Sequence, residues 1–394
     1  MLPFFDADHA ALRERARRWV QDAGGKASGE GEVLRAAADR GELEARAVTL
    51  ARALGAAGFL KHAVPAAFGG VREKVQARDL CILREELAYG GALADLMFAM
   101  QALAGYPIAL AASPQQKKSL LPALARGECI GAFAITEIEA GSDAASLQTR
   151  AERRGDEYCL NGAKRFISNA GIAGGYVVFA ATAPEKKSKG ISAFWIEANH
   201  PGLILKERTE LLSPHPIGAL ELRDCVVARR ALIGQEGDGL RIAFETLDFL
   251  RCTVGAAAAG LARRALDEAI GHSKKRRQFG RALAEFQGIE FKLAEMATEL
   301  EAARLLVYQA AWAHDSAAAE AKQKSSMAKF YAAEAAQRIV DQSLQIHGGS
   351  GLIAGSIMER LYRDVRALRI YEGTSEIQKL IIARGVLAKS RIED

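Results

Sequence analysis

The chain has 394 residues, of which 49% are hydrophobic and 26% are charged. This length favours about two or three domains, and the composition excludes a disordered or low-complexity protein. The net charge of +5 is small for this length and is spread among acidic neighbours, so it does not require a nucleic-acid partner but suits small anionic ligands.

The patterns of cysteine, histidine and apolar residues indicate the cellular compartment, and whether a metal site or a membrane span is expected. The five cysteines are odd in number and lack CxxC spacing, which favours free thiols in a reducing cytoplasm. The seven histidines show no HExxH or paired spacing, so no metal site is expected. The longest apolar stretches, such as 254–262, are too short to cross a bilayer, and no hydrophobic signal segment is seen. The sequence therefore predicts a cytoplasmic protein without membrane insertion.

Three regions differ in the spacing of their apolar residues. Residues 1–128 show helical spacing and predict an N-terminal helical domain. Residues 129–238 change to β-rich runs at 130–135, 176–180, 191–196 and 220–227, which predict a small β-barrel or sandwich. Residues 239–394 return to helical spacing with almost no proline, as in a helix bundle. The expected fold class is α+β and multidomain.

Local signals add detail to this order. The first 18 residues contain four arginines interrupted by acidic residues, and a first helix is expected there instead of a transit peptide. The dipeptides Gly155-Asp156 and Asn161-Gly162 predict turns between strands. Helical spacing in the last region covers 282–313, 322–346 and 375–387.

The most informative side chain is Glu372, within the run RIYEGTSEIQKL at 369–380. Gly373 follows it, and Thr374 and Ser375 precede apolar residues at helical spacing, which places the acid in a turn before a capped helix. A carboxylate in an apolar pocket has a raised pKa and can remove a proton from carbon. Glu372 is therefore the candidate catalytic base, and the alternative is a surface glutamate before a helix.

Four further runs accompany the Glu372 run: GAFAITEIEAGSDAASLQT at 131–149, RFISNAG at 165–171, RRQFG at 276–280 and QIHGGSG at 345–351. In this order and at these separations, the five runs resemble the acyl-CoA dehydrogenase family. The resemblance covers almost the whole chain and is weakest before residue 80 and at 211–220. It implies a helical domain, a β domain and a C-terminal four-helix bundle. It also implies FAD as the cofactor and oxidation of an acyl-CoA to a trans-2-enoyl-CoA. An electron-transfer flavoprotein would be the acceptor, and the enzyme would be a homo-oligomer, as a dimer of dimers.

The resemblance assigns the flavin contacts residue by residue. The hydroxyl of Thr136 at a strand end suits the pyrimidine edge of the flavin. Phe166 and Ser168, two residues apart on one strand, direct a ring and a hydroxyl to the flavin, with Ser168 near N5. Many relatives carry Trp and Thr at these two positions. The expected cofactor-binding residues are Phe133, Ile135, Thr136, Phe166, Ser168, Arg276, Gln278, Phe279, Phe286, Gln287, Gln345, Gly348, Gly349, Thr374 and Glu376.

Each flavin assignment has a simpler alternative. The Thr136 segment could be a polar corner and Phe166 an ordinary core residue. In the family, Arg276 supplies a charged fork to the FAD diphosphate of a neighbouring subunit, which implies at least a dimer. Without the resemblance, 274–277 reads as a solvated charge run. The glycines at 348–349 could be only a helix stop, although such a stop also lets backbone approach a ligand.

The expected substrate-binding residues are Ser142, Asp248, Arg251, Tyr371 and Gly373. Asp248 and Arg251 lie at i, i+3, which alone usually means a surface ion pair. Some family members carry their base one residue before the matching arginine, but this chain has Leu250 there. The helix around 94–101 would form an apolar pocket floor. Asp95 stands where glutaryl-CoA dehydrogenases place an arginine, so a dicarboxylic substrate is not expected.

Two departures from the family pattern affect the substrate. The segment LLSPHPIGA at 211–219 replaces a glycine-rich, serine-bearing form, and Ile138 replaces a proline. The acyl group is expected to be small to medium, branched or cyclic. The alternatives are a flavin oxidase or monooxygenase of the same fold and a catalytically silent acyl-CoA-binding flavoprotein. An acyl carrier protein could also replace CoA.

Overall fold

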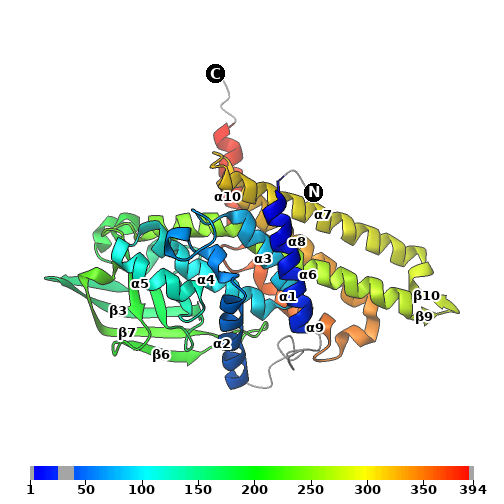
Figure 1. The fold of residues 1–394 in the computed structure, drawn as a ribbon, viewed down its shortest axis with the longest axis horizontal. Coiled ribbons are helices and arrows are strands. Elements are labelled where there is room, and N and C mark those ends of the chain that lie inside the picture. Colours follow the sequence, from blue (N-terminus) through cyan, green and yellow to red (C-terminus); the bar gives the residue numbers. More distant parts are fainter. Residues whose placement is uncertain (1–3, 25–39, 390–394) are drawn as a thin grey trace. The chain divides into compact units, whose positions relative to one another are not determined.

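The computed structural model describes residues 4–24 and 40–389, which form two compact units (Figure 1). Unit 1 contains the described residues of Met1–Ala36, together with Gln76–Asp95 and Asp248–Asp394. Unit 2 contains Ala37–Val75 and Leu96–Leu247. Two long helices, α4 (Ala92–Ala111) and α6 (Gly239–Lys275), have residues in both.

Unit 1 is helical. Besides its part of α6, it contains α1 (Ala7–Gly24), α3 (Ala77–Gly90), α7 (Gln287–Asp315), α8 (Ala321–His347), α9 (Ile357–Arg366) and α10 (Ser375–Lys389). Small residues let these helices pack closely, because a Cβ on Gly260 of α6 would lie 2.3 Å from the Glu85 carbonyl oxygen of α3. The predicted first helix and C-terminal helical region are confirmed. The helix expected from 282 begins only at 287, after the short hairpin β9 (Arg277–Gln278) and β10 (Arg281–Ala282).

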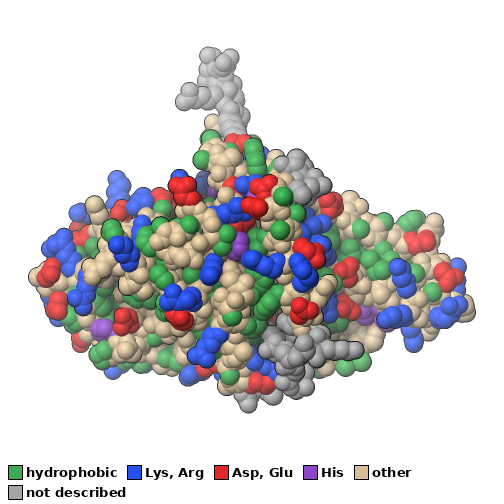
Figure 2. All heavy atoms as spheres, viewed as in Figure 1, with side chains coloured by type: hydrophobic (Ala, Val, Ile, Leu, Met, Phe, Trp, Pro, Cys, Tyr) green, Lys and Arg blue, Asp and Glu red, His purple; other side chains and the backbone are tan. Residues whose placement is uncertain are grey.

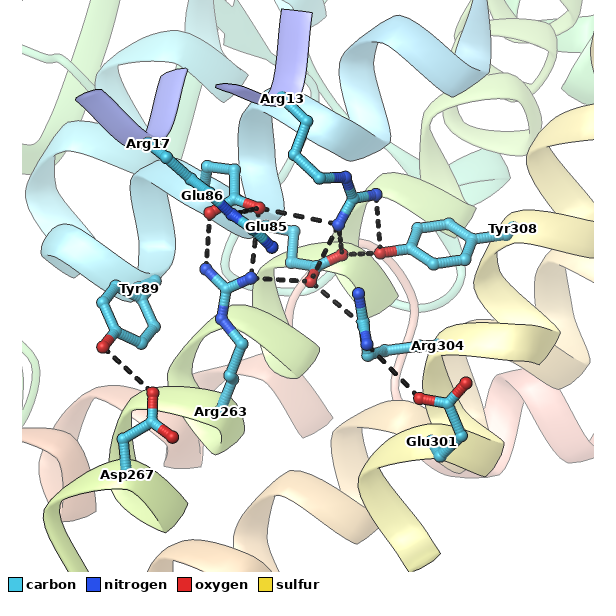
Figure 3. Close-up of polar contacts among 10 residues, drawn as sticks. All are labelled: Arg13, Arg17, Glu85, Glu86, Tyr89, Arg263, Asp267, Glu301, Arg304 and Tyr308. Atoms are coloured by element: carbon cyan, nitrogen blue, oxygen red, sulfur yellow. Dashed lines mark hydrogen bonds and ion pairs between the residues drawn. The ribbon is translucent and has the colours of Figure 1, made fainter. Parts of the chain in front are cut away.

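A buried charge network connects α1 to α3, α6 and α7 (Figure 3). At its centre are Glu85 and Glu86 of α3, which are 0% and 1% exposed. Arg263 Nη2 lies 2.5 Å from Glu86 Oε2, and Arg304 Nε lies 3.1 Å from Glu85 Oε1. Burial alone would raise the pKa of Glu86, but the arginine contacts hold it below the usual value. The other members are Arg13, Arg17 and Tyr308.

Unit 2 is built on one eight-stranded sheet in the order β6-β7-β3-β2-β4-β5-β8, with β1 paired to β4. The strands are β1 (Gly131–Ala134), β2 (Arg150–Arg154), β3 (Glu157–Ser168), β4 (Gly175–Ala181), β5 (Ile191–Glu197), β6 (Leu203–Arg208), β7 (Ile217–Ala228) and β8 (Leu232–Ile233). The expected barrel or sandwich thus takes the form of a single sheet. The helices α2 (Arg40–Ala56), α5 (Pro114–Ala125) and most of α4 also belong to this unit.

The two turn predictions had different outcomes. The turn at Gly155-Asp156 is confirmed, because Gly155 has φ of 64° and joins β2 to β3. The turn at Asn161-Gly162 was wrong, since both residues lie inside β3 where its register with β7 shifts. A Cβ on Gly162 would lie 2.6 Å from Thr149 Oγ1. This glycine therefore serves a close approach of two chain segments and not a change of direction.

Helix α4 is the one described helix that is long and apolar enough to cross a membrane by length and composition. Its apolar window is 72% buried within the protein, as in the core helix of a soluble fold. The expectation that the longest apolar stretches are too short to cross a bilayer was therefore wrong for this helix. On the face drawn in Figure 2, basic and acidic side chains are interspersed and do not gather by sign.

Candidate active site

Glu372 lies in a tight turn that leads into α10. Both Glu372 and Gly373 have positive φ, at 52° and 90°. The Thr374 side-chain oxygen accepts a hydrogen bond from the Ile377 amide at 3.3 Å, which caps the helix. The predicted turn before a capped helix is therefore confirmed. Positive φ is unusual for glutamate, and it is maintained by the contacts of the next residue.

The carbonyl of Gly373 is held by two buried donors. Lys329 Nζ of α8 donates to it at 2.7 Å, and Gln378 Nε2 of α10 donates at 2.9 Å. Both donors are 0% exposed. Glu334 of α8 braces the ends of the same loop by accepting from Arg369 and Ser375. The sequence reading missed Lys329, because a single lysine among helical alanines gives no sign that it points inward.

The surroundings of Glu372 explain its ionisation. Its Oε2 atom is inaccessible to solvent and has no hydrogen-bond partner among the described residues. Burial raises its pKa, whereas the cations Arg84, Lys329 and Arg251 oppose that rise, and the net pKa stays above the ordinary value. Burial also lowers the pKa of Lys329 to about 8. These surroundings differ from those of a surface glutamate, and the role of Glu372 as a base stays a prediction.

A buried ion pair lies in the same charge environment. Arg84 binds Asp95 through two parallel hydrogen bonds of 2.8 and 2.9 Å and donates to Thr253 Oγ1 at 2.9 Å. Both charged side chains are almost fully buried. Burial raises the pKa of Tyr371, and the positive charge of Arg84 opposes that rise. Asp95, in the helix expected to form an apolar pocket floor, is thus committed to a buried ion pair.

Asp248 and Arg251 form the expected ion pair on α6, and Lys322 Nζ also lies 2.7 Å from Asp248 Oδ2. Arg251 is 5% exposed, so this is not the exposed surface pair of the simpler reading. Its Nε has no hydrogen-bond partner among the described residues. Leu250, the position of the base in some relatives, is buried. Unit 1 therefore brings Arg251 and Tyr371 into the charge environment of Glu372.

In unit 2, hydrogen bonds from Lys164 and Arg165 fix the backbone at and next to Thr136. The Arg165 amide donates to the Thr136 carbonyl at 2.9 Å. Lys164 Nζ donates to Glu137 Oε1 at 2.7 Å and to the Ile135 carbonyl at 3.3 Å. Phe133 and Ile135 are largely buried, whereas Ser142 is exposed in the following loop.

Phe166 and Ser168 require a correction. They were expected on one face of a regular strand, but the register between β3 and β7 shifts after Lys164, and Phe166 has φ of 55°. The bulge changes the direction of the Phe166 side chain, so period-two reasoning does not apply to it. The ring is 50% exposed, which contradicts the simple core alternative. An exposed aromatic ring can still stack on a flat heteroaromatic ligand such as a flavin.

The residues expected at the outer half of the FAD lie in exposed positions. Phe279 is 93% exposed at the turn of the β9–β10 hairpin, and its ring lies 6.3 Å from that of Phe286. Helix α8 ends at His347, and Gly348 has φ of 58°, which confirms the glycine stop. The remaining exposed members of this set are Arg276, Gln278, Gln287, Gln345, Gly349 and Glu376.

Comparison with known families decides what this arrangement belongs to. The acyl-CoA dehydrogenase N-terminal, middle and C-terminal domains match residues 6–128, 132–225 and 237–387. The chain belongs to the acyl-CoA dehydrogenase family. It is an oxidoreductase with the three-part architecture of that family: a helical, a β and a second helical domain.

Curated relatives and solved structures agree with this assignment. The chain is 40% identical to an acyl-CoA dehydrogenase of Bacillus subtilis over 86% of this chain and 89% of that protein. It is also 40% identical to the 3-(aryl)acrylate reductase of Clostridium sporogenes, over 84% and 88% of the two chains. The butyryl-CoA dehydrogenase of Megasphaera elsdenii superposes with a TM-score of 0.88 at 31% identity, covering 97% and 99% of the chains.

Two further solved structures are relevant to the cofactor and the acceptor. The complex of PigA with FAD and proline has a TM-score of 0.86 at 28% identity, covering 98% of this chain and 99% of that one. The prolyl acyl carrier protein oxidase AnaB has the same TM-score at 30% identity, covering 97% and 99%. The family match and the FAD complex support FAD as the cofactor of this chain.

Proposed function

We propose that this protein oxidises an acyl-CoA thioester between its α and β carbons, with Glu372 as the base that removes the α proton. The observation that carries the proposal is the carboxylate of Glu372, which is inaccessible at Oε2 and has a raised pKa beside the buried cations Lys329, Arg84 and Arg251. A raised pKa brings a carboxylate closer to the weakly acidic proton of a thioester α carbon. The product is a trans-2-enoyl-CoA.

We propose that FAD is held by the cofactor-binding residues named from the sequence. When bound, FAD supplies the acceptor for the β hydride. Thr136 and the neighbouring backbone would hold the ring system, with Phe166 against the ring and Ser168 toward N5. Arg276, Phe279 and the 345–349 backbone bind the outer half of a cofactor in a second copy of the chain, so the enzyme is a homo-oligomer.

The chain's own residues also prepare the thioester. The backbone N–H of Glu372 donates to the thioester carbonyl and stabilises the enolate-like charge that develops when the α proton leaves. Lys329 holds the following carbonyl in place, so the base and this N–H keep their orientation. Tyr371, Asp248, Arg251 and Ser142 line the path of the acyl-CoA.

The proposed acyl group is small to medium, branched or cyclic. Arg84 is committed to Asp95 and Thr253, so it is not available to bind a second carboxylate of a dicarboxylic substrate. We propose an electron-transfer flavoprotein as the acceptor and the cytoplasm as the location. We also propose domain limits of 1–128, 129–238 and 239–394.

Relatives favour a second candidate, reduction of an enoyl thioester by the same residues in reverse. Two relatives of this chain are named acryloyl-CoA reductase (NADH) and 3-(aryl)acrylate reductase, and a raised pKa also suits Glu372 as the acid that returns the α proton. An oxidase using oxygen or a carrier-protein substrate is the third, because AnaB shares the fold.

Anaerobic titration of the FAD-loaded protein separates these candidates. A panel of linear, branched, cyclic, aryl and dicarboxylic acyl-CoAs is added while the flavin absorbance is recorded. Bleaching by one class supports dehydrogenation and names the substrate group. If only a carrier-protein thioester bleaches the flavin and no acyl-CoA does, the substrate is carried by that protein. Rapid reoxidation of the reduced enzyme in air favours the oxidase. No bleaching by any thioester, together with reoxidation of the reduced enzyme by enoyl-CoAs, favours the reductase.

A further inference from the structure

The segment 211–219, which departs from the family pattern, brings a histidine to Ser168. His215 Nε2 lies 3.4 Å from Ser168 Oγ. The same segment continues into β7, where Ile217 is the register partner of Ser168 in β3. The contact thus joins two neighbouring strands at their ends.

The backbone around His215 is fixed on both sides. Pro214 and Pro216 flank it, and each proline restricts its own φ. The Pro216 carbonyl accepts a hydrogen bond from the Asn169 amide at 2.8 Å. The segment therefore holds the imidazole in one place and does not let it sample many positions.

A side chain from α2 closes the same segment. Arg40 donates from Nη1 to the Thr209 carbonyl and from Nη2 to the Ile217 carbonyl, both at 2.6 Å. These two carbonyls lie before and after His215 in the chain. The guanidinium thus clamps the segment and places a fixed positive charge near the imidazole.

The contacts of His215 decide which ring nitrogen carries the proton. Its Nδ1 lies 3.3 Å from the Ser213 carbonyl oxygen, which can only accept, so Nδ1 carries the hydrogen. Burial and the nearby Arg40 lower the pKa of His215 to about 4, so the ring is neutral at pH 7. In a neutral ring of this tautomer Nε2 can only accept. The Ser168 hydroxyl must therefore be the donor in this contact.

We propose that His215 is a positioning residue that draws the Ser168 hydroxyl proton toward itself, leaving Ser168 Oγ as a hydrogen-bond acceptor toward flavin N5. The inference rests on the proposed function, which puts Ser168 beside N5. N5 of an oxidised flavin accepts a hydrogen bond, whereas the N–H of the reduced flavin donates one. An acceptor at Ser168 therefore favours the reduced flavin, and His215 raises the flavin midpoint potential.

The test compares the midpoint potentials of FAD-loaded variants, measured with a reference dye and without any acyl thioester. In His215→Phe the Ser168 hydroxyl is free to donate to the oxidised flavin. We expect the reduction equilibrium to fall by about tenfold, the order of one hydrogen bond, which for a two-electron couple is about 30 mV. His215→Gln keeps an acceptor and should recover most of the wild-type potential. His200→Phe, in the same unit, should leave it unchanged.

A double-mutant cycle separates an action through Ser168 from a general effect of the histidine. If His215 acts through Ser168, His215→Phe has no further effect on the potential in a Ser168→Ala background. A shift of the same size in that background overturns the proposal, and so does an unchanged potential in the single variant. Failure of every acyl thioester to bleach the flavin would instead refute the proposed function and leave these potentials interpretable.

A second measurement needs no cofactor. Nitrogen NMR of the imidazoles in the apoprotein, assigned by comparison with His215→Phe, reports tautomer and charge directly. The proposal expects a neutral ring protonated on Nδ1 at pH 7. A ring protonated on Nε2, or a cationic ring, overturns it.

Discussion

The regions around Glu372 and around Ser168 are held in contrasting ways. In unit 1, the turn at Glu372 lies among buried cations, and Lys329 both binds its neighbouring carbonyl and contributes charge. In unit 2, Ser168 meets a histidine of lowered pKa, and Phe166 is set by a bulge of the backbone. One region is organised by charge and the other mainly by backbone geometry and neutral hydrogen bonds.

This difference matches the two halves of the proposed reaction. Removal of the α proton depends on the pKa of a carboxylate, which burial raises and nearby charges adjust. Transfer of the β hydride depends on orientation and on which hydrogen bonds a ring nitrogen can make. Variants should therefore change pH dependence when they touch the first region and potential or orientation when they touch the second.

The largest expected effect comes from removing the base. Glu372→Gln keeps the size of the side chain but cannot take a proton, so the rate of flavin reduction by substrate should fall by about 10²–10⁴-fold. Stopped-flow absorbance measures it. Glu295→Gln, an exposed glutamate on α7, is the control and should react at the wild-type rate. An active Glu372→Gln would show that Glu372 is not the group that removes the α proton.

The next effect concerns stability. Arg84→Met leaves Asp95 buried without its partner, and loss of one member of a buried pair costs about 3–5 kcal/mol of unfolding free energy. Urea unfolding measures the change. Arg126→Met breaks an exposed pair with Glu128 and should cost far less than Arg84→Met. The double variant Arg84→Met, Asp95→Leu should recover part of the loss, and no recovery would contradict a charge-based cause.

A smaller effect tests the charge of Lys329. Glu372 must be ionised to act as a base, so the rate rises with pH through its pKa, and a nearby cation lowers that pKa. Lys329→Met removes the cation, so the rising limb of flavin reduction should move to higher pH. On that limb, a shift of about one pH unit would lower the rate at a given pH by about tenfold, or ~1.4 kcal/mol. Lys329→Arg keeps the charge and should keep the limb in place. An unmoved limb in Lys329→Met would show that Lys329 acts only through the backbone.

The raised pKa of Glu372 also has a consequence for stability, with a definite sign. A carboxyl whose folded pKa lies above its unfolded value stabilises the fold at low pH, and this contribution is lost as pH rises through the folded pKa. Glu372→Gln should therefore unfold at higher temperature than the wild type at pH 8 and at about the same temperature at pH 4. Calorimetry at both values checks it, and equal differences at both pH values would contradict the raised pKa.

The smallest effect concerns an exposed contact. Lys322 is largely exposed and pairs with Asp248, so Lys322→Ala should cost only about 0–1 kcal/mol of unfolding free energy. The same urea assay measures it. A loss as large as that of Arg84→Met would mean that exposure does not separate strong from weak pairs in unit 1.

The order of the domains and the position of Glu372 could be predicted from the sequence. Apolar spacing predicts the helical, β and helical order, and the cap at Thr374 places Glu372 in its turn. The rest depends on contacts between residues far apart in the chain. Lys329 reaches a carbonyl 44 residues away, and no local pattern indicates that a helical lysine points inward. Asn161-Gly162 has the composition of a turn, but glycine is also used inside strands where two chain segments approach closely. A strand bulge such as that at Phe166 interrupts the alternation of side chains and has no sequence signal of its own.

One measurement isolates the removal of the α proton by Glu372. An acyl-CoA in which sulfur replaces the β carbon can lose an α proton but cannot release a β hydride. The FAD-loaded enzyme and Glu372→Gln are each incubated with this thioester in D₂O, and deuterium at the α carbon is followed by mass spectrometry. The account predicts exchange in the wild type and none above the enzyme-free rate in Glu372→Gln. Equal exchange in both proteins would contradict it.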